Sequence, residues 1–219
     1  MNYQLQEFSS VNEYWDFLIQ AFIELNPKSI AASGGSAANL FNHLQAIHLK
    51  DKSIYLADER FVPETDQFSN ARLLRSTSSF NELDESQFIS CQPELYPNHL
   101  ICAQEYSKKL PESIDLTILG VGPDGHIASL FPHGDWLQLD HDNKQKYIGT
   151  FTNEFDIHDR MSMTYSQIQR SQNIWILMIG QNKQKILDII KDETCDFHRY
   201  PGRKILDFGA KIFFLNETV

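Results

Sequence analysis

A strand-like run that leads into a glycine-rich loop is the most constraining feature of this chain. Residues 115–121 are mostly apolar, as is typical of a parallel strand buried on both faces. The loop at 120–126 reads Gly-Val-Gly-Pro-Asp-Gly-His, and its glycines permit backbone angles and close approaches that side chains forbid. Ligands of open α/β sheets sit beyond the carboxyl ends of the strands, so Asp124 and His126 lie where chemistry is expected. The alternative is a tight turn with a surface Asp and His.

Three charged residues follow a second strand-like segment. Residues 53–57 are β-prone and apolar, and they run directly into Asp58, Glu59 and Arg60, after which Pro63 closes the segment. Ionised groups are rarely buried without partners, so packing does not explain this cluster at the end of a buried strand. The segment therefore indicates a functional site, with a solvated group containing a local ion pair as the alternative.

A third strand end predicts an anion site. The strand-like segment 29–32 leads into a short loop and then into an amphipathic run over 36–48. The loop consists of Ser33, Gly34, Gly35 and Ser36. Glycines before a helix start let backbone N–H groups point at a phosphate, and the helix N-terminus favours negative charge. The loop is neither a P-loop nor a G-x-G-x-x-G motif, and a simple helix-capping turn is the alternative.

Length and composition favour a single domain over residues 1–219. A chain of 219 residues with 42% hydrophobic content can bury one sizeable core. It contains no apolar run of the roughly 18 residues that a membrane span needs, so we expect no membrane association. The first eight residues lack the basic and apolar regions of a signal peptide.

Charge and cysteine content narrow the range of partners. The net charge of −10 argues against nucleic acid, which requires a basic face, so an anionic substrate must be captured by local cations and amides. Cys91, Cys102 and Cys195 lack C-x-x-C spacing and indicate reduced thiols in a cytoplasmic protein. The histidines show no metal-ligand spacing, His133 being a weak candidate for the site. We expect no metal, no cofactor, and a monomer or weak homo-oligomer.

Alternating strand and helix patterns predict the fold class. A capping box at 10–13 opens a first helix, which ends at Asn26-Pro27. Strands are predicted at 29–32, 53–57, 115–121, 147–150, 173–180 and 211–215. Helices are predicted at 36–48, 69–74, 101–109, 165–170 and 183–190, with a short one after His126 and mainly loops elsewhere in 133–160. This alternation predicts a Rossmann-like α/β domain with a mainly parallel sheet and helices on both faces.

The strand ends together resemble the 6-phosphogluconolactonase family, within the wider group that includes glucosamine-6-phosphate deaminases. Residues 33–36 resemble the family's phosphate loop, and residues 58–70 resemble its D-E-R-x-V-P…D…S-N segment. Residues 120–132 are similar to its G-x-G-P-D-G-H-x-A-S-L-F-P signature. Residues 160–164 and 180–183 resemble its later R-x-[ST]-x-T and G-x-x-K elements. Two departures are Ala37-Ala38 in place of the usual Thr-Pro after the phosphate loop, and the region 133–158, which matches nothing in the family.

The resemblance implies hydrolysis of 6-phospho-D-glucono-1,5-lactone to 6-phosphogluconate. His126 is the expected general base, because an ordinary imidazole titrates near neutral pH. Asp124 is expected to fix the loop or the imidazole tautomer, and Asp58 to orient water or a sugar hydroxyl. Arg60 and Arg160 are candidates for the phosphate or the developing carboxylate, since a guanidinium suits both groups. The last candidate for ligand contact is Lys183, with a place on the surface or at a helix start as the favoured alternative.

Two other functions compete with this one. The related amino-sugar phosphate deaminase-isomerases share the glycine loop and the histidine. They are similar around this loop but carry Glu where this chain has Phe131, and Tyr where it has Arg60. A non-enzymatic sugar-phosphate sensor on the same fold would keep the anion site but lose the base, whereas His126 is present here.

Overall fold

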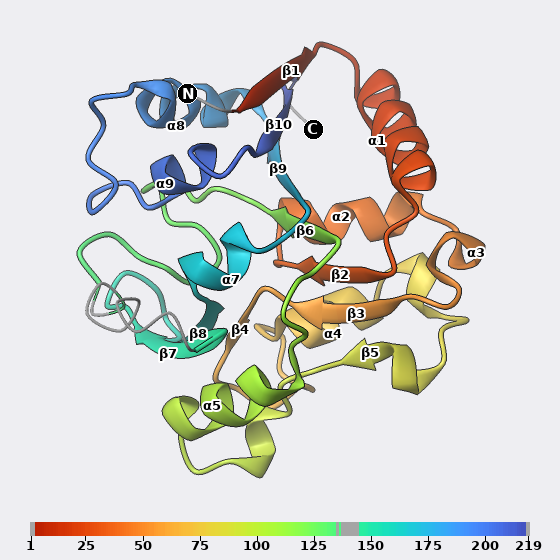
Figure 1. Cartoon of the computed structure of the whole chain (residues 1–219), viewed down its shortest axis with the longest axis vertical. Helices are drawn as coiled ribbons and strands as arrows, with labels where there is room; N and C mark the ends of the chain where they lie inside the picture. The colour runs from red at the N-terminus through yellow and green to blue at the C-terminus, as the bar shows by residue number, and fades with distance from the viewer. Residues whose placement is uncertain (1–2, 135, 137–144, 218–219) are drawn as a thin grey trace.

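The apolar runs of the sequence form one seven-stranded sheet in the computed structural model, which describes residues 3–134, 136 and 145–217 (Figure 1). The strand order is β1-β10-β9-β6-β2-β3-β5, and every neighbouring pair is parallel. The strands are β1 (Gln4–Phe8), β2 (Ser29–Ala32), β3 (Ser53–Leu56), β5 (Phe88–Ile89), β6 (Leu116–Leu119), β9 (Asn173–Ile179) and β10 (Lys211–Leu215). All four residues of β6 are buried, as its apolar composition predicts.

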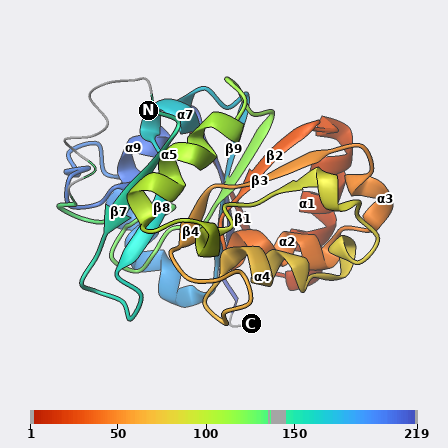
Figure 2. The same cartoon turned by 90° about the horizontal axis from the view of Figure 1, so that it is seen from below.

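Helices cover both faces of this sheet, which confirms the predicted layers (Figure 2). On one side lie α1 (Val11–Leu25), α2 (Ser36–His43), α3 (Ala46–Leu49) and α4 (Asn70–Arg75). On the other lie α5 (His99–Lys109), α7 (Tyr165–Gln169) and α9 (Gly202–Leu206). The helix α8 (Gln184–Lys191) precedes α9, and short 3₁₀ turns occupy Ser78–Phe80, Glu85–Gln87, Pro93–Leu95 and Gln181–Lys183.

The order in which strands are added to the sheet reverses between β2 and β6, which are parallel neighbours in the middle of the sheet. From β2 the chain moves to β3 on one side, and from β6 it moves to β9 on the other. Such a switch point leaves a crevice beyond the carboxyl ends of the two strands, because their loops turn away from each other. The loops at 33–36 and 120–126 begin at these two ends, which confirms their predicted position at the carboxyl edge of the sheet.

A second, smaller sheet was not predicted. It is antiparallel, with the order β4-β8-β7, and consists of β4 (Asp58–Arg60), β8 (Asp159–Met163) and β7 (Tyr147–Phe151). Only β7 was expected, because β4 is short and charged and β8 carries no apolar run. The prediction of one strand over 53–57 therefore missed that the chain changes sheets after Ala57.

Two helix predictions were wrong. The run over 36–48 is interrupted at Leu44, whose extended backbone (φ −76°, ψ 149°) separates α2 from α3. After His126 the chain forms tight turns with isolated bridges from Val121 to Ile127 and from Ile127 to Leu130, not a short helix. The hydrogen bond from the Gly122 amide to the His126 carbonyl (2.9 Å) draws this loop back on itself, so no helix can continue from it.

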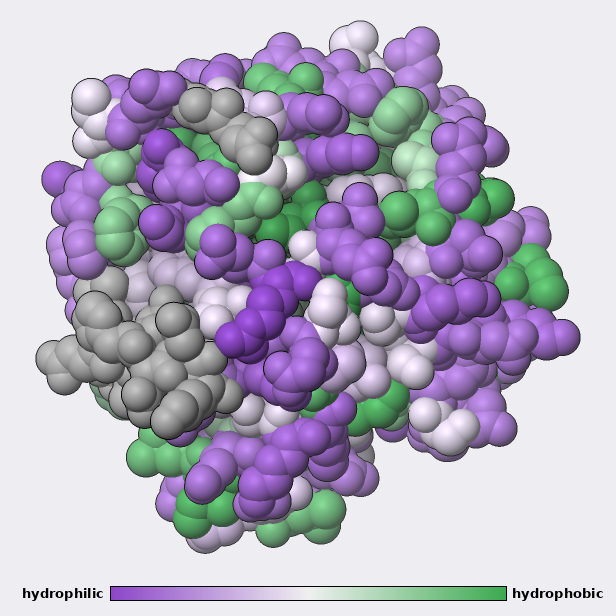
Figure 3. Space-filling model, in the orientation of Figure 1, coloured by the Kyte–Doolittle hydropathy of each residue, from purple (hydrophilic) through white to green (hydrophobic). Residues whose placement is uncertain are grey.

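The remaining differences concern short or marginal elements. The edge strands β1 and β5 and the helix α9 were not predicted, and the other boundaries moved by a few residues. Residues 135 and 137–144, part of the segment expected to be loop, lie outside the described residues. No helix within the described part of the chain is long and apolar enough to cross a membrane. The face shown in Figure 3 is mostly hydrophilic, with hydrophobic residues in small separate areas.

Candidate active site

A cavity of about 200 Å³ lies at the switch point of the sheet. The loops after β2, β6 and β9 reach it, and β4 forms a further wall. Of the predicted site residues, the cavity brings together Ser33, Gly34, Gly35, Ser36, Asp58, Arg60, His126 and Lys183. Asp124 and Arg160 do not line the cavity. Asp124 forms a hydrogen bond with His126, and Arg160 lies opposite Arg60 in the neighbouring strand.

The loop 33–36 presents the start of α2 to the cavity. Gly35 is the N-cap residue, with φ 58°, a conformation that favours glycine. No side chain caps α2, and no acidic residue lies in its first turn. The first amides of this helix and its dipole are therefore available to an anion. Ala37, which replaces the family's usual threonine, is fully buried and supplies no hydroxyl.

Lys183 adds a positive charge to the cavity. Its ammonium group donates a hydrogen bond to the Val121 carbonyl (2.7 Å), which holds the side chain against the loop after β6. Burial lowers the pKa of Lys183, and the charge of Asp124 partly opposes this change. Lys183 thus lies at a helix start, as the N-cap residue of α8, and its side chain also lines the cavity.

Arg60 and Arg160 face each other across the small sheet, where β4 pairs with β8. Arg60 donates to the Phe68 carbonyl, and Arg160 donates from Nε to the Ile157 carbonyl (2.7 Å). Neither has a carboxylate within ion-pair distance among the described residues. Burial and the neighbouring Arg60 lower the pKa of Arg160 to about 10, so the guanidinium group of Arg160 stays charged at neutral pH. Two adjacent cations without a counter-ion suit an anionic ligand.

His126 and Asp124 form a hydrogen-bonded pair beside these cations. Their Nδ1 and Oδ1 atoms lie 2.6 Å apart, and the His126 amide also reaches this oxygen (3.2 Å). Burial disfavours the charged form of Asp124, but the hydrogen bond and charge of His126 outweigh it and lower the pKa of this carboxyl. A carboxylate only accepts, so Nδ1 carries the proton and Nε2 remains to accept another.

Close packing fixes the imidazole. A Cβ at Gly122 would overlap the His126 ring and approach Asp124 Oδ1 to 2.7 Å, so only glycine fits there. The rings of Phe131 and Phe155 lie 4.9 Å and 5.6 Å from the imidazole, measured between centroids. Phe155 comes from the β7–β8 hairpin, in the region that matched nothing in the family.

Asp58 is buried on another wall of the cavity. Its Oδ2 accepts from the Ser129 hydroxyl (2.9 Å), whereas Oδ1 has no partner. Among the described residues, seven buried side-chain polar atoms lack a hydrogen-bond partner, and four of them belong to residues that line this cavity. The four are Ser33 Oγ, Asp58 Oδ1, Arg60 Nε and Asn70 Oδ1. Buried polar atoms are nearly always satisfied, so this concentration points to a polar ligand.

Sequence reasoning missed several cavity residues. Asn70 stood in a recognised segment but was not singled out, and its amide Nδ2 donates to the Asp58 carbonyl (2.9 Å). Gly120, Val121, Gly122 and Ala128 also line the cavity, and they belong to the signature that the sequence analysis recognised without being named as site residues. Phe155 carried no local signal, because its contacts join segments far apart in the chain. No group of three or more His, Cys, Asp or Glu side chains in the described ranges is arranged to hold a metal ion.

A larger cavity of about 840 Å³ borders Asp124 and Phe131 and extends to α8. It shares no lining residue with the smaller one. We assign the candidate site to the smaller cavity, because His126, the start of α2 and the unsatisfied polar atoms converge there.

The chain is similar in sequence to several 6-phosphogluconolactonases. It is 31% identical over 183 residues to the enzyme of Neisseria meningitidis, with 79% of this chain and 78% of the relative covered. It is 30% identical over 210 residues to a probable 6-phosphogluconolactonase of Dictyostelium discoideum, with 88% and 87% covered.

Solved structures share the fold. The 6-phosphogluconolactonase of Leishmania guyanensis superposes with a TM-score of 0.84 at 20% identity, covering 99% of this chain and 97% of the other. The one from Shewanella baltica gives 0.83 at 22% identity, with 97% of each chain covered. Residues 9–213 match the family described as glucosamine-6-phosphate isomerases/6-phosphogluconolactonase, and the chain belongs to this family.

Proposed function

We propose that this protein hydrolyses 6-phospho-D-glucono-1,5-lactone to 6-phosphogluconate, with His126 as the general base. The observation that carries the proposal is the Asp124–His126 pair at a cavity whose other walls hold an uncapped helix start, Arg60 and Lys183. A base beside an anion site suits a phosphorylated substrate that reacts with water. The relatives that are named 6-phosphogluconolactonase support the same substrate.

The chemistry follows from the hydrogen bonds of His126. Asp124 holds the proton on Nδ1, so Nε2 takes a proton from water as the water oxygen attacks the lactone carbonyl carbon. The bond between this carbon and the ring oxygen then breaks, and the ring oxygen receives the proton from Nε2. General-base assistance of this kind contributes roughly 10²–10⁴ in rate, which is adequate because such lactones already open slowly in water.

The remaining residues bind and orient the substrate. The amides of 33–36, with Ser33, Ser36, Arg60 and Lys183, hold the phosphate, and Arg160 reinforces the positive charge. Asp58, whose Oδ1 has no partner, orients a hydroxyl of the substrate or the attacking water. No metal or cofactor takes part in this scheme. The three free cysteines, two of them buried, suit a reducing compartment such as the cytoplasm.

The structure also bears on the deaminase alternative. Phe131 occupies the position where the deaminases carry Glu, and its ring lies 4.9 Å from the His126 ring. A phenyl group cannot transfer a proton, so the second titratable group that ring opening of an amino sugar needs is missing there. We therefore expect no ammonia release from glucosamine 6-phosphate.

A direct assay tests the proposal. Freshly prepared lactone should be hydrolysed faster than its spontaneous opening, and exhaustive chelation should leave the rate unchanged. Ammonia release from glucosamine 6-phosphate, measured in parallel, should stay at background. Steady ammonia production that is abolished by His126→Asn would overturn the assignment, as would the absence of any lactone hydrolysis above the spontaneous rate.

A further inference from the structure

Glu59 is a fully buried acid between two cavity residues. Its relative exposure is 0%, while Asp58 and Arg60 on either side line the cavity. Glu59 itself does not line the cavity, and none of the lysines and arginines that the structure describes forms an ion pair with it. A buried carboxyl without a counter-ion is costly unless hydrogen bonds compensate it, so its partners indicate its role.

Four donors surround the carboxyl group of Glu59. Oε1 accepts from the backbone amides of Arg60 (2.7 Å) and Asn70 (2.7 Å). Oε2 accepts from the Ala71 amide (2.8 Å) and the Ser69 hydroxyl (3.1 Å). Three of these donors are fixed N–H groups, so they require two acceptor oxygens, as a carboxylate provides.

These bonds connect the two elements that carry the cations and amides of one cavity wall. The Arg60 amide belongs to β4, and the amides of Asn70 and Ala71 belong to the first turn of α4. Asn70 adds a second link between α4 and β4, because its side-chain amide donates a hydrogen bond to the Asp58 carbonyl (2.9 Å). The carboxyl group of Glu59 thereby fixes the relative position of three cavity residues, Asp58, Arg60 and Asn70.

We propose that Glu59 is a positioning residue for phosphate recognition, acting through Arg60 and Asn70 and not by contact with the substrate. The proposal rests on the proposed function for the identity of the substrate, but the anion site itself can be tested without it. The competing explanation is that Glu59 only caps α4 and stabilises the fold. That role would lower the activity toward any lactone alike, whereas a positioning role is specific to the phosphate group.

Glu59→Gln tests the proposal with little change of shape. Glutamine has one acceptor oxygen, so its NH₂ group must face either the Ala71 amide or the amides of Arg60 and Asn70. The hydrogen bonds on that side of the side chain are then lost. At pH 8, above the pKa of about 7 to which burial raises Glu59, we expect kcat/KM for the phosphorylated lactone to fall roughly 10-fold or more, mainly through KM, with the unphosphorylated lactone nearly unaffected. Glu59→Asp, which keeps both acceptor oxygens, should recover part of the loss.

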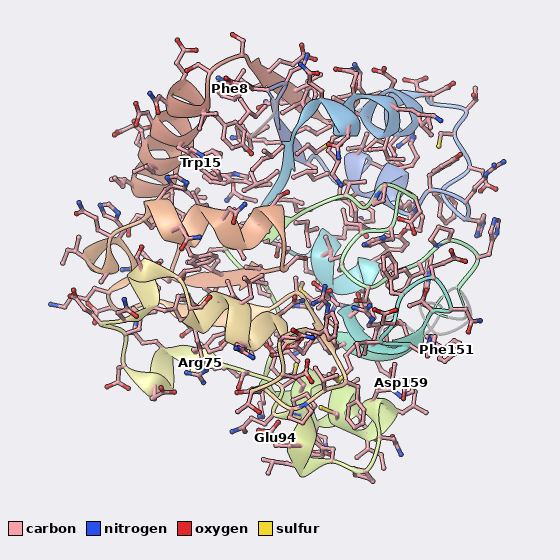
Figure 4. All side chains as sticks on the ribbon, turned by 180° about the vertical axis from the view of Figure 1, so that it is seen from behind. Phe8, Trp15, Arg75, Glu94, Phe151 and Asp159 are labelled. Carbon is pink, nitrogen blue, oxygen red and sulfur yellow. The ribbon has the colours of Figure 1, made fainter. Side chains whose placement is uncertain are left out.

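Glu64→Gln is the matched control. Glu64 also accepts a backbone hydrogen bond, from Gln92 (3.1 Å), and lies 3.9 Å from Arg75, and neither Glu64 nor these two partners line the cavity. Its neighbours Arg75 and Glu94 are labelled in Figure 4. The phosphate preference of this variant, the ratio of kcat/KM for the two lactones, should match that of the wild type.

A binding measurement separates this proposal from the assignment of the reaction. Inorganic phosphate should raise the melting temperature of the wild type and of Glu64→Gln, and raise that of Glu59→Gln much less. If the wild type hydrolyses no lactone, the proposed function fails, yet the phosphate-induced shift still tests Glu59. An equal shift in all three proteins, or an equal loss on both lactones, would show that Glu59 serves only the fold.

Ser69→Ala provides a second route if Glu59→Gln does not fold. It removes one of the four donors and leaves the carboxyl group in place. A reduction of about 2- to 12-fold in phosphate preference is expected, on the scale of one net hydrogen bond. An unchanged preference in a folded Ser69→Ala protein would overturn the proposal.

Discussion

The two sides of the cavity are built differently. The anion side consists of the start of α2, β4 and α4, and the acid that links the last two is completely buried. The base side is partly open, since the side chains of His126 and Asp124 are 20% and 30% exposed. Backbone hydrogen bonds hold the anion side, while a close glycine and aromatic rings hold the imidazole.

The difference fits the roles that we propose for the two sides. Binding a phosphate needs charges and dipoles that are fixed before the ligand arrives, and burial strengthens their interaction with it. A general base must exchange protons with water, so it needs a fixed tautomer and some access to solvent. Substitutions on the two sides should therefore affect different kinetic constants, and the following predictions test this division.

His126→Asn should cause the largest loss. It removes the proton acceptor but keeps a polar group of similar size, so kcat should fall by about 10²-fold or more with little change in KM. Steady-state kinetics on freshly made lactone measure this effect. His158→Asn is the control, because His158 stacks on Phe151 and neither residue lines the cavity. Wild-type kcat in His126→Asn would remove this residue from the mechanism.

Glu59 should make the stability of the protein depend on pH. Burial raises its pKa to about 7, although three backbone hydrogen bonds oppose the change. Because this pKa exceeds that of the unfolded chain, folding favours the neutral acid: this contribution to stability is complete below about pH 4.5 and is lost as the pH rises through about 7, where the carboxylate that accepts all four hydrogen bonds forms. The expected change is about 3 kcal/mol in the free energy of unfolding.

Denaturant titrations of the wild type and Glu59→Gln between pH 4.5 and 8 measure this contribution. As the pH increases, the free energy of unfolding of the wild type should fall relative to that of Glu59→Gln. Parallel curves would mean that the carboxyl group keeps the same protonation state throughout, and hence that its hydrogen bonds outweigh burial.

Arg60→Ala should affect binding more than turnover. It removes a charge-assisted contact worth roughly 1.5–3 kcal/mol, so KM for the phosphorylated lactone should rise by roughly 10- to 150-fold. The unphosphorylated lactone should be a poor substrate for the wild type, and its hydrolysis should be nearly unaffected by Arg60→Ala. Comparable losses on both substrates would place Arg60 at the reacting end and contradict the division between the two sides.

Phe155→Ala should give the smallest effect, and it should appear in kcat. The Phe155 ring contacts those of His126 (5.6 Å) and Phe131 (5.7 Å) and lies 5.6 Å from the Arg160 guanidinium. Such contacts are worth about 0.5–1.5 kcal/mol, so kcat should fall roughly 2- to 12-fold. Phe151→Ala is the control from the same hairpin (Figure 4), and equal effects of the two changes would argue against a specific role.

Much of the site could be predicted because it follows from local sequence and sheet topology. Apolar runs predict the parallel strands, and parallel strands with alternating helices bring their carboxyl ends to one edge. That is why the loops 33–36 and 120–126 could be placed together before the structure was known. The error after His126 has a local cause, since hydrogen bonds within the loop close tight turns where a helix was expected.

The sequence by itself determined the α/β class, the resemblance to the family, and the identity of the charged and glycine-rich strand ends. Only the tertiary structure decided that Arg60 and Arg160 pair across a small sheet, that Glu59 links β4 to α4, and that Phe155 reaches the imidazole. These contacts join residues between 11 and about 100 positions apart along the chain. Periodicity reports which face of an element is buried, but not which distant element covers it, because the packing of the whole domain selects that partner.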